Sequence, residues 1–264
     1  MKKTLATLRA LLIDLDGVLW VGQQTLPGVH AFFQFLRARG LCFILVSNNS
    51  TRRAAYTVER MQRMGVHIDL ADVLTTAEAT PRWLRVHAPQ LQRVLVVGET
   101  ALRDALAQAR FEIVERDADA VIVGLDRQVN YEKLKRATLE LRRGARFIAT
   151  NTDRTLPTEE GLTPGAGALV AALVAATDIE PLVIGKPGRP LFELALDIAG
   201  TTIQETAMLG DRLDTDIDGA AALGLTTIMV LTGVSTRAQA AQNKYQPDFI
   251  FENLDALRQA WETA

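Results

Sequence analysis

Asp14 and Asp16 stand two residues apart at the end of an apolar run, in the stretch LLIDLDGVL (11–19). Side chains of a β-strand alternate between its faces with a period of two, so we expect both carboxylates on the same side. Neighbouring ionised carboxylates repel each other and lose hydration when they are buried. The pair therefore indicates either a turn with Asx hydrogen bonds or a site where a cation offsets the repulsion.

Three further polar clusters follow apolar runs in the same way. Ser47, Asn48 and Asn49 follow LCFILV, Lys186 follows LVIG, and Asp211 follows AMLG. Ligands of open parallel sheets bind at the carboxyl ends of the strands. We therefore expect the four clusters to converge on one crevice.

The carboxylates of this set are suited to a hard divalent cation. Mg²⁺ prefers oxygen ligands and is bound through a few carboxylates together with substrate phosphate. Such an ion would hold Asp14 and Asp211 in their ionised forms. Asp14 could then attack phosphorus and form an aspartyl-phosphate, while Asp16 moves a proton to the leaving alcohol and later from water.

The remaining polar residues suit the phosphoryl group. Ser47 and Asn48 offer hydroxyl, amide and backbone N–H donors, and Lys186 offers a positive charge. Each feature also has a structural interpretation: SNNS could cap the helix that follows it, the Asp residues of GDRLDTDID could favour a helix N-terminus, and Lys186 could lie in a turn. The joint placement of the four clusters favours the functional interpretation.

Composition excludes several other classes. The 264 residues carry 29 basic and 31 acidic side chains, so no basic excess predicts binding to nucleic acid. No apolar run is long enough to span a bilayer, and we expect no membrane partner. Cys42 stands alone, and the N-terminus lacks the pattern of an export signal, so we expect a cytoplasmic protein.

Alternating apolar runs and helical patterns predict an α/β fold with a doubly wound, mainly parallel sheet. We expect a core of two segments, 1–78 and 183–264, interrupted by a smaller α/β domain over 79–182. A single large sheet is the alternative. Strands are predicted at 11–15, 41–47, 181–185, 207–211, 225–233 and 248–251 in the core, and at 93–99, 119–126 and 145–151 in the inserted block.

The inserted block contains one loop with candidate specificity residues. The stretch TDRTLPTEEGLTPGAG (152–167) is predicted as a Gly/Pro/Thr-rich loop, in which Asp153, Arg154 and Thr155 could reach the leaving group of a substrate. A well-built turn without this role is the alternative. Tyr131, in the core or at a helix N-terminus, and Trp20 are expected to be structural.

The order of these motifs resembles a known family. DLDGV, SNNSTR, GKP and GDRLDTDI resemble the four motifs of haloacid dehalogenase (HAD) superfamily phosphatases. GLDRQVNYEKL (124–134), the ATN–D–P–G–PGAGAL pattern (149–169) and LTGVS (231–235) resemble the branch with a large C2-type cap, subfamily IIA. That branch includes 4-nitrophenylphosphatases and phosphatases of phosphoglycolate, pyridoxal phosphate, nucleotides or sugars. The resemblance implies a Rossmann-like core, Mg²⁺ and a homodimer formed through the cap.

The resemblance also implies a role for each matched residue. Asp14 matches the nucleophile and a metal ligand, and Asp16 the general acid/base, whose backbone carbonyl also binds the metal. Asp211 matches a direct metal ligand and Asp216 the residue that supports it through a bound water. The phosphate-binding positions are Ser47, Asn48 and Lys186, with Asn49 in support.

We therefore expect a Mg²⁺-dependent phosphomonoester hydrolase acting on a small metabolite. A phosphotransferase that passes the phosphoryl group to another alcohol is the alternative within the enzyme class. A receiver-like signalling domain and a non-catalytic module that binds a phosphorylated ligand are alternatives of other classes. The length of the chain disfavours the receiver domain, and intact Asp14 and Asp16 disfavour the binding module.

Overall fold

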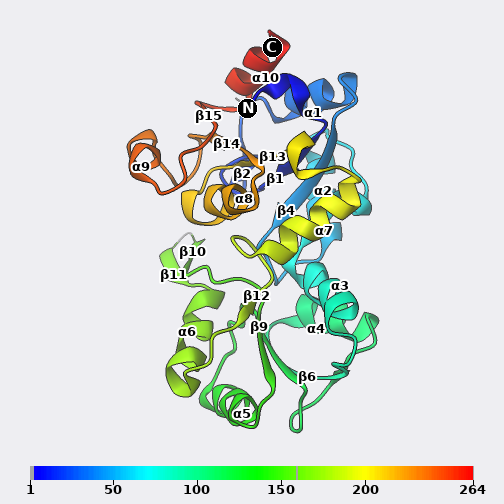
Figure 1. The fold of residues 1–264 in the computed structure, drawn as a ribbon, viewed down its shortest axis with the longest axis vertical. Coiled ribbons are helices and arrows are strands. Elements are labelled where there is room, and N and C mark those ends of the chain that lie inside the picture. The colour runs from blue at the N-terminus through cyan, green and yellow to red at the C-terminus, as the bar shows by residue number, and fades with distance from the viewer. Residues whose placement is uncertain (1–2, 159, 264) are drawn as a thin grey trace. The chain divides into compact units, whose positions relative to one another are not determined.

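The computed structural model describes residues 3–158 and 160–263, which form two compact units. The first unit combines the chain up to Ser47 with Ala55–Leu74 and the segment from Phe192 onward, and the second combines Asn48–Ala54 with Thr75–Leu191. The chain thus passes between the units four times. Figure 1 labels the elements of both units.

The first unit is built on a six-stranded sheet in the order β15-β14-β13-β1-β4-β5. The neighbours from β15 to β4 pair in parallel. The strands are β1 (Ala10–Ile13), β4 (Cys42–Ser47), β5 (Val73–Thr75), β13 (Thr206–Gly210), β14 (Thr226–Val230) and β15 (Phe249–Phe251). A short antiparallel hairpin, β2 (Trp20–Val21) and β3 (Gln24–Thr25), follows β1.

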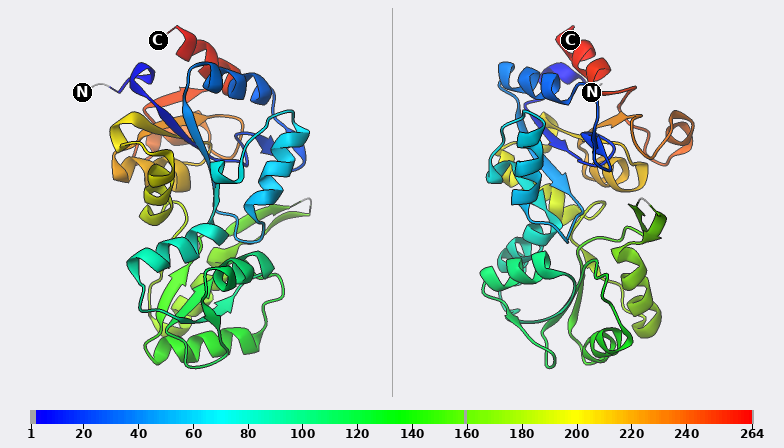
Figure 2. Two further views of the ribbon diagram at one scale, coloured as in Figure 1. Left: turned by 90° about the vertical axis from the view of Figure 1, so that its right-hand side faces the viewer. Right: turned by 180° about the vertical axis from the view of Figure 1, so that it is seen from behind.

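Helices cover both faces of this sheet, as a doubly wound fold requires. In the left view of Figure 2, α1 and α2 lie on one side of the sheet and α7 and α8 on the other. The helices are α1 (Val29–Ala38), α2 (Ala54–Arg63), α7 (Arg189–Ala199), α8 (Asp218–Leu223), α9 (Arg237–Gln242) and α10 (Leu254–Glu262). All four residues of β1 are buried, so its apolar sequence reflects packing on both faces.

The second unit has its own five-stranded parallel sheet, in the order β12-β9-β8-β6-β7. Helices α5 and α6 pack on it around Val121, Phe147 and Leu173, and α3 and α4 lie on the opposite face (Figure 1). The strands are β6 (Arg93–Val97), β7 (Glu112–Ile113), β8 (Ala120–Val123), β9 (Arg146–Ala149) and β12 (Leu182–Val183); the helices are α3 (Thr76–His87), α4 (Thr100–Gln108), α5 (Tyr131–Arg142) and α6 (Ala166–Thr177).

The predicted α/β class with parallel sheets is confirmed, and two local expectations are corrected. The strand predicted at 181–185 is β12, and it pairs with β9 of the second sheet. The predicted loop contains an antiparallel hairpin, β10 (Thr155–Thr158) and β11 (Gly161–Pro164), in which Leu156 lies opposite Thr163. Of the two positions predicted for Tyr131, the structure confirms the helix N-terminus, because Tyr131 begins α5 and is 76% exposed. The boundaries 1–78, 79–182 and 183–264 stay a prediction.

None of the helices in the described part of the chain combines the length and the apolar character needed to cross a membrane.

Candidate active site

Three of the predicted site residues stand at the ends of adjacent strands in the first unit. Asp14 directly follows β1, Ser47 ends β4, and Asp211 directly follows β13. The order β13-β1-β4 and the register that places Ile13 opposite both Leu209 and Leu45 bring these ends together. Parallel pairing thus collects, at one edge, residues that are far apart in sequence.

Three carboxylates gather at this edge, and we call Asp14, Asp211 and Asp216 the acidic cluster. One carboxylate oxygen from each lies within 4.8 Å of the others. Asp211 is 1% exposed and Asp216 is fully buried. Asp216 was predicted only to support the metal site, yet its carboxylate stands within the cluster itself.

Asp211 is held by the loop after β14. The backbone N–H of Val234 donates to Asp211 Oδ2 at 2.6 Å. Gly17 and Gly233 both approach this carboxylate so closely that a Cβ at either position would overlap it, and Gly17 has a left-handed φ of 82°. The glycines of DLDGV and LTGVS therefore make room for the Asp211 side chain.

The side chain of Asp216 is held by the backbone of the residues that directly follow β13. Its Oδ2 accepts hydrogen bonds from the backbone N–H groups of Asp211, at 3.3 Å, and Arg212, at 3.1 Å. The same segment is tied to the LTGVS loop, because Leu213 N donates to Ser235 Oγ at 3.0 Å. Two predicted motifs thus support each other, although LTGVS was noted only as part of the family resemblance.

The acidic cluster has the chemistry of a divalent-cation site. All three side chains supply carboxylate oxygens, the ligands that hard cations select. Buried carboxylates this close together repel one another strongly in a medium of low dielectric constant. A bound cation removes that repulsion, so the residues present fit a divalent metal.

Asp16 lies beside the cluster residue Asp14 in sequence but is held by a different partner. The indole N–H of Trp20 donates to Asp16 Oδ1 at 2.9 Å. Trp20 is buried, and the guanidinium of Arg60 stacks on its ring 4.0 Å from the centroid. Trp20 therefore orients a predicted catalytic carboxylate, a role that sequence reasoning missed. The i, i+4 spacing of an indole donor and an Asp was the available signal.

The other predicted phosphate-binding residues lie in the second unit. Asn48 Oδ1 accepts from the backbone N–H of Lys186, and Asn48 Nδ2 donates to the carbonyl of Lys186, both at 2.8 Å. Lys186 is 2% exposed. The structure therefore joins the second and third motifs of the sequence directly.

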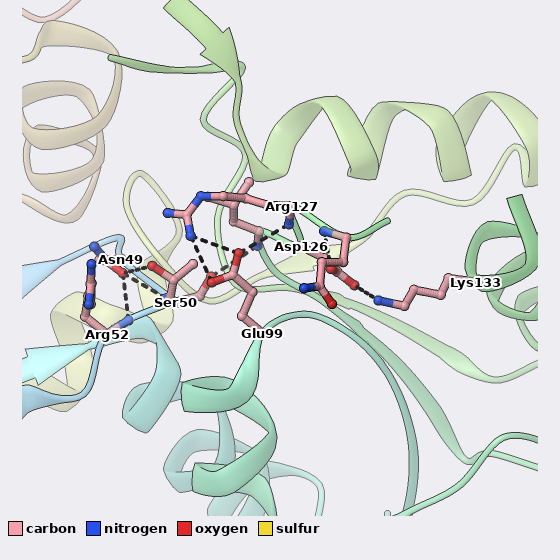
Figure 3. Close-up of polar contacts among 10 residues, drawn as sticks. Asn49, Ser50, Arg52, Glu99, Asp126, Arg127 and Lys133 are labelled. Carbon is pink, nitrogen blue, oxygen red and sulfur yellow. Dashed lines mark hydrogen bonds and ion pairs between the residues drawn. The ribbon is translucent and has the colours of Figure 1, made fainter. Parts of the chain in front are cut away.

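Asn49 and Ser50 act on the backbone around them (Figure 3). Asn49 Oδ1 accepts from the N–H groups of Thr51 and Arg52, at 2.8 and 3.0 Å, in an Asx-type turn that precedes α2, which begins at Ala54. Ser50 Oγ accepts from Leu125 N at 3.2 Å. Asn49 therefore stabilises the turn before α2 and does not cap the helix itself, and its support of phosphate binding stays a prediction.

The stretch GLDRQVNYEKL forms a loop and the first turn of α5 in the second unit, and hydrogen bonds within the stretch stabilise it (Figure 3). The buried Asp126 carboxylate accepts from Lys133 Nζ at 2.6 Å and from Gln128 N at 2.9 Å. Arg127 Nη1 donates to both carboxylate oxygens of Glu99 at 3.1 Å. These contacts give Asp126, Arg127 and Lys133 a structural role in the motif.

The three candidate specificity residues differ in their surroundings. Asp153 is half-buried, and both its carboxylate oxygens lie 3.3 Å from Asn48 Nδ2. Arg154 and Thr155 are exposed. Their roles toward a leaving group stay predictions.

The predicted site residues are thus divided between the units. The first holds Asp14, Asp16, Ser47, Asp211 and Asp216, and the second holds Asn48, Asn49, Lys186, Asp153, Arg154 and Thr155. Convergence of all four clusters on one crevice stays a prediction.

Comparison with known families and proteins agrees with this architecture. The family model described as haloacid dehalogenase-like hydrolase matches residues 11–112, and a second model, described as HAD-hydrolase-like, matches residues 183–257. An acid sugar phosphatase of Staphylococcus aureus is 38% identical over 248 residues, which cover 94% of this chain and 95% of that protein.

Solved structures give the same result. A p-nitrophenyl phosphatase from Archaeoglobus fulgidus superposes with a TM-score of 0.90 at 35% identity, covering 96% of this chain and 98% of that one. A glycerol phosphate phosphatase from Mycobacterium tuberculosis, solved with calcium, gives a TM-score of 0.86 at 37% identity, covering 96% and 75%. The chain belongs to the haloacid dehalogenase-like hydrolase family.

Proposed function

We propose that this HAD-type phosphatase hydrolyses a phosphate monoester of a small metabolite, with Mg²⁺ bound at the acidic cluster. The observation that carries the proposal is the gathering of Asp14, Asp211 and Asp216 at the ends of adjacent parallel strands. Relatives are named for sugar phosphate, glycerol phosphate and 4-nitrophenyl phosphate. We assign no single substrate among such small esters.

Asp14, Asp211 and the backbone carbonyl of Asp16 are assigned to the metal, with Asp216 supporting them. The metal would supply positive charge that offsets repulsion between Asp14 and the phosphate. Val234 and the two glycines at Asp211 support this assignment, because they fix the carboxylate before any ligand arrives.

The carboxylates carry the chemistry of the proposal. An oxygen of Asp14 attacks phosphorus and forms the aspartyl-phosphate as the bond to the leaving alcohol breaks. Asp16 gives its proton to that alcohol. In the second step Asp16 takes a proton from water, whose oxygen attacks phosphorus and releases Asp14 and inorganic phosphate. Trp20 keeps Asp16 oriented for both transfers.

Ser47 and Lys186 are assigned to the phosphoryl oxygens, with the backbone N–H of Asn48. A hydroxyl and an ammonium group are suitable donors to an anionic phosphate. Asp153, Arg154 and Thr155 remain the candidates for contact with the leaving group. Cytoplasmic location and a homodimer through the cap also stay predictions from sequence.

One assay separates hydrolysis from its alternatives. Inorganic phosphate release from 4-nitrophenyl phosphate, glycerol phosphate and sugar phosphates is measured for wild type and Asp14→Asn, with Mg²⁺ and with EDTA. We expect release that requires both Mg²⁺ and Asp14. Transfer to a second alcohol in place of release would indicate a phosphotransferase, and phosphate binding without turnover would indicate a binding module. Turnover that persists with EDTA would overturn the proposed metal dependence.

A further inference from the structure

The side chain of Asn48 forms a paired contact with the backbone of Lys186. The Lys186 N–H donates to Asn48 Oδ1, and Asn48 Nδ2 donates to the Lys186 carbonyl, both at 2.8 Å. In a hydrogen-bonded pair of antiparallel strands, two residues exchange N–H···O bonds in the same way. Here the side-chain amide of Asn48 takes the place of one backbone. Both backbone groups of Lys186 are fixed by a single side chain.

Asn48 is itself held from several sides. Its backbone carbonyl accepts from Thr76 Oγ1 at 2.9 Å and from Asn151 Nδ2 at 2.7 Å. A Cβ at Gly185 would lie 2.5 Å from Asn48 Oδ1, so the glycine before Lys186 allows the close approach. The amide therefore has little freedom to turn toward another partner.

Asp153 determines which way the amide faces. An ionised carboxylate accepts hydrogen bonds but cannot donate them. Both Asp153 oxygens lie 3.3 Å from Asn48 Nδ2. The nitrogen therefore points toward Asp153, which leaves Oδ1 toward the Lys186 N–H. Asp153 thus selects the amide orientation that Lys186 requires.

The number of donors on the Asn48 side chain argues against a direct contact between this side chain and phosphate. A carboxamide nitrogen has two hydrogens. One is used by the Lys186 carbonyl and the other by Asp153. No side-chain donor of Asn48 is left for a phosphate oxygen.

We propose that Asn48 is a positioning residue for Lys186, oriented by Asp153, and that its side chain does not contact the phosphoryl group. This inference rests on the proposed function, because it takes Lys186 as the phosphate-binding lysine. A buried ammonium group on four rotatable bonds gains from a fixed backbone, since less conformational freedom is lost when it binds an anion. Asn48 and Asp153 supply that fixed backbone.

A double-mutant cycle tests the inference. Binding of inorganic phosphate in the presence of Mg²⁺ is measured by calorimetry for wild type, Asn48→Ala, Lys186→Ala and the double variant. We expect Asn48→Ala to weaken binding about tenfold in wild type and less than about twofold in the Lys186→Ala background. Equal factors in both backgrounds would mean that Asn48 contacts phosphate independently, which would overturn the inference.

An exchange of the two side chains sharpens the test. Asn48→Asp removes the donor to the Lys186 carbonyl and places a second carboxylate against Asp153. Adding Asp153→Asn restores a donor between the two positions, so we expect the double variant to recover phosphate affinity and kcat relative to Asn48→Asp. Failure to recover, with the thermal unfolding temperature restored, would contradict the assigned role of Asp153.

Thr177→Ala serves as the control for general destabilisation. Thr177 lies in the same unit, is buried, and donates to Leu173 O at 2.6 Å. We expect it to lower the unfolding temperature without changing phosphate affinity. If wild type neither binds phosphate nor hydrolyses any ester, the proposed function fails. If wild type does both and the cycle is additive, only the positioning role fails.

Discussion

The two units hold their predicted functional residues in opposite ways. In the first unit, three carboxylates are brought together, two at buried positions and Asp14 at a half-buried one. In the second, a neutral amide is placed where its donors and its acceptor are all used, by Lys186 and Asp153. In the first arrangement the carboxylates repel one another, whereas in the second each donor of the amide faces an acceptor.

This difference indicates where each unit should respond to change. Removing charge from the acidic cluster should act on metal binding and chemistry, since the proposed cation binds to these carboxylates. Removing the amide of Asn48 should act through the geometry of Lys186, because that network involves no ligand. The following predictions test this distinction, from the largest expected effect to the smallest.

Asp14→Asn should lower kcat at least about a thousandfold, because an amide cannot serve as the nucleophile in place of a carboxylate. The measurement is phosphate release from 4-nitrophenyl phosphate at saturating Mg²⁺. Asp214→Asn is the matched control: Asp214 is an exposed carboxylate paired with Arg212, outside the acidic cluster. Activity of Asp14→Asn within tenfold of wild type would rule out this residue as the nucleophile.

Asp211→Asn should weaken Mg²⁺ binding by about 10- to 100-fold, because one carboxylate ligand is lost. The amide oxygen of the substituted residue can still accept the hydrogen bond from the backbone N–H of Val234, so the side chain stays in place. Mg²⁺ at about 100 times its Kd should stabilise wild type by about 2.7 kcal/mol, and the variant should lose most of that gain. Thermal unfolding with Mg²⁺ and with EDTA measures both. Equal stabilisation of the two proteins would place the metal elsewhere.

Trp20→Phe should lower kcat about threefold to tenfold, because Asp16 loses a hydrogen bond worth about 1 kcal/mol. We expect KM to change little, since Trp20 orients the acid/base and not the phosphate. Trp83→Phe is the control, because the buried indole N–H of Trp83 donates to no group in the described structure. An equal loss in both variants would show that ring packing alone is responsible.

Asp119 should contribute a small, pH-dependent stabilisation to the second unit. The backbone N–H groups of Arg93 and Gln92 donate to its carboxylate and lower its pKa below the ordinary value of about 3.9. A carboxyl with a lowered pKa in the folded state stabilises the protein above the unfolded-state value, and this contribution disappears as pH falls through the folded-state pKa.

Urea unfolding of wild type and Asp119→Ala at pH 7, 5 and 3.5 measures this effect. We expect a loss of about 1 kcal/mol at pH 7 and pH 5 that begins to shrink at pH 3.5. Activity should be unchanged at neutral pH, because Asp119 lies outside both groups of site residues. Glu180→Ala, which removes a carboxylate at an exposed position, is the control substitution. A difference that grows toward acid pH would contradict the assigned sign.

Much of the first unit could be predicted from the sequence. The apolar runs at 10–13, 207–210 and 226–230 became adjacent parallel strands, and Asp14 and Asp211 stand directly after two of them. Buried parallel strands leave a strong local signal, since both faces must be apolar. The strand ends follow from that signal and the parallel order.

The second unit was less predictable at the points that matter for the site. The short strand β12 was expected in the first sheet, although it pairs with β9. Two paired residues carry no information about their partner strand. Likewise, the residue type alone could not show that the Asn48 side chain bonds to the backbone of Lys186, because an Asn amide can bind a ligand or a backbone equally well.

The sequence alone determined which residue types stand at strand ends, and therefore the carboxylate chemistry and the family. Only the tertiary structure decided that Asp216 stands with Asp14 and Asp211, that Trp20 holds Asp16, and that Asn48 uses its amide on Lys186. The physical reason is that the type of each side chain is given by its position in the sequence, whereas its hydrogen-bond partners come from segments that are distant in the sequence. Which partners the few donors and acceptors of a polar side chain bond to is determined only when the chain has folded.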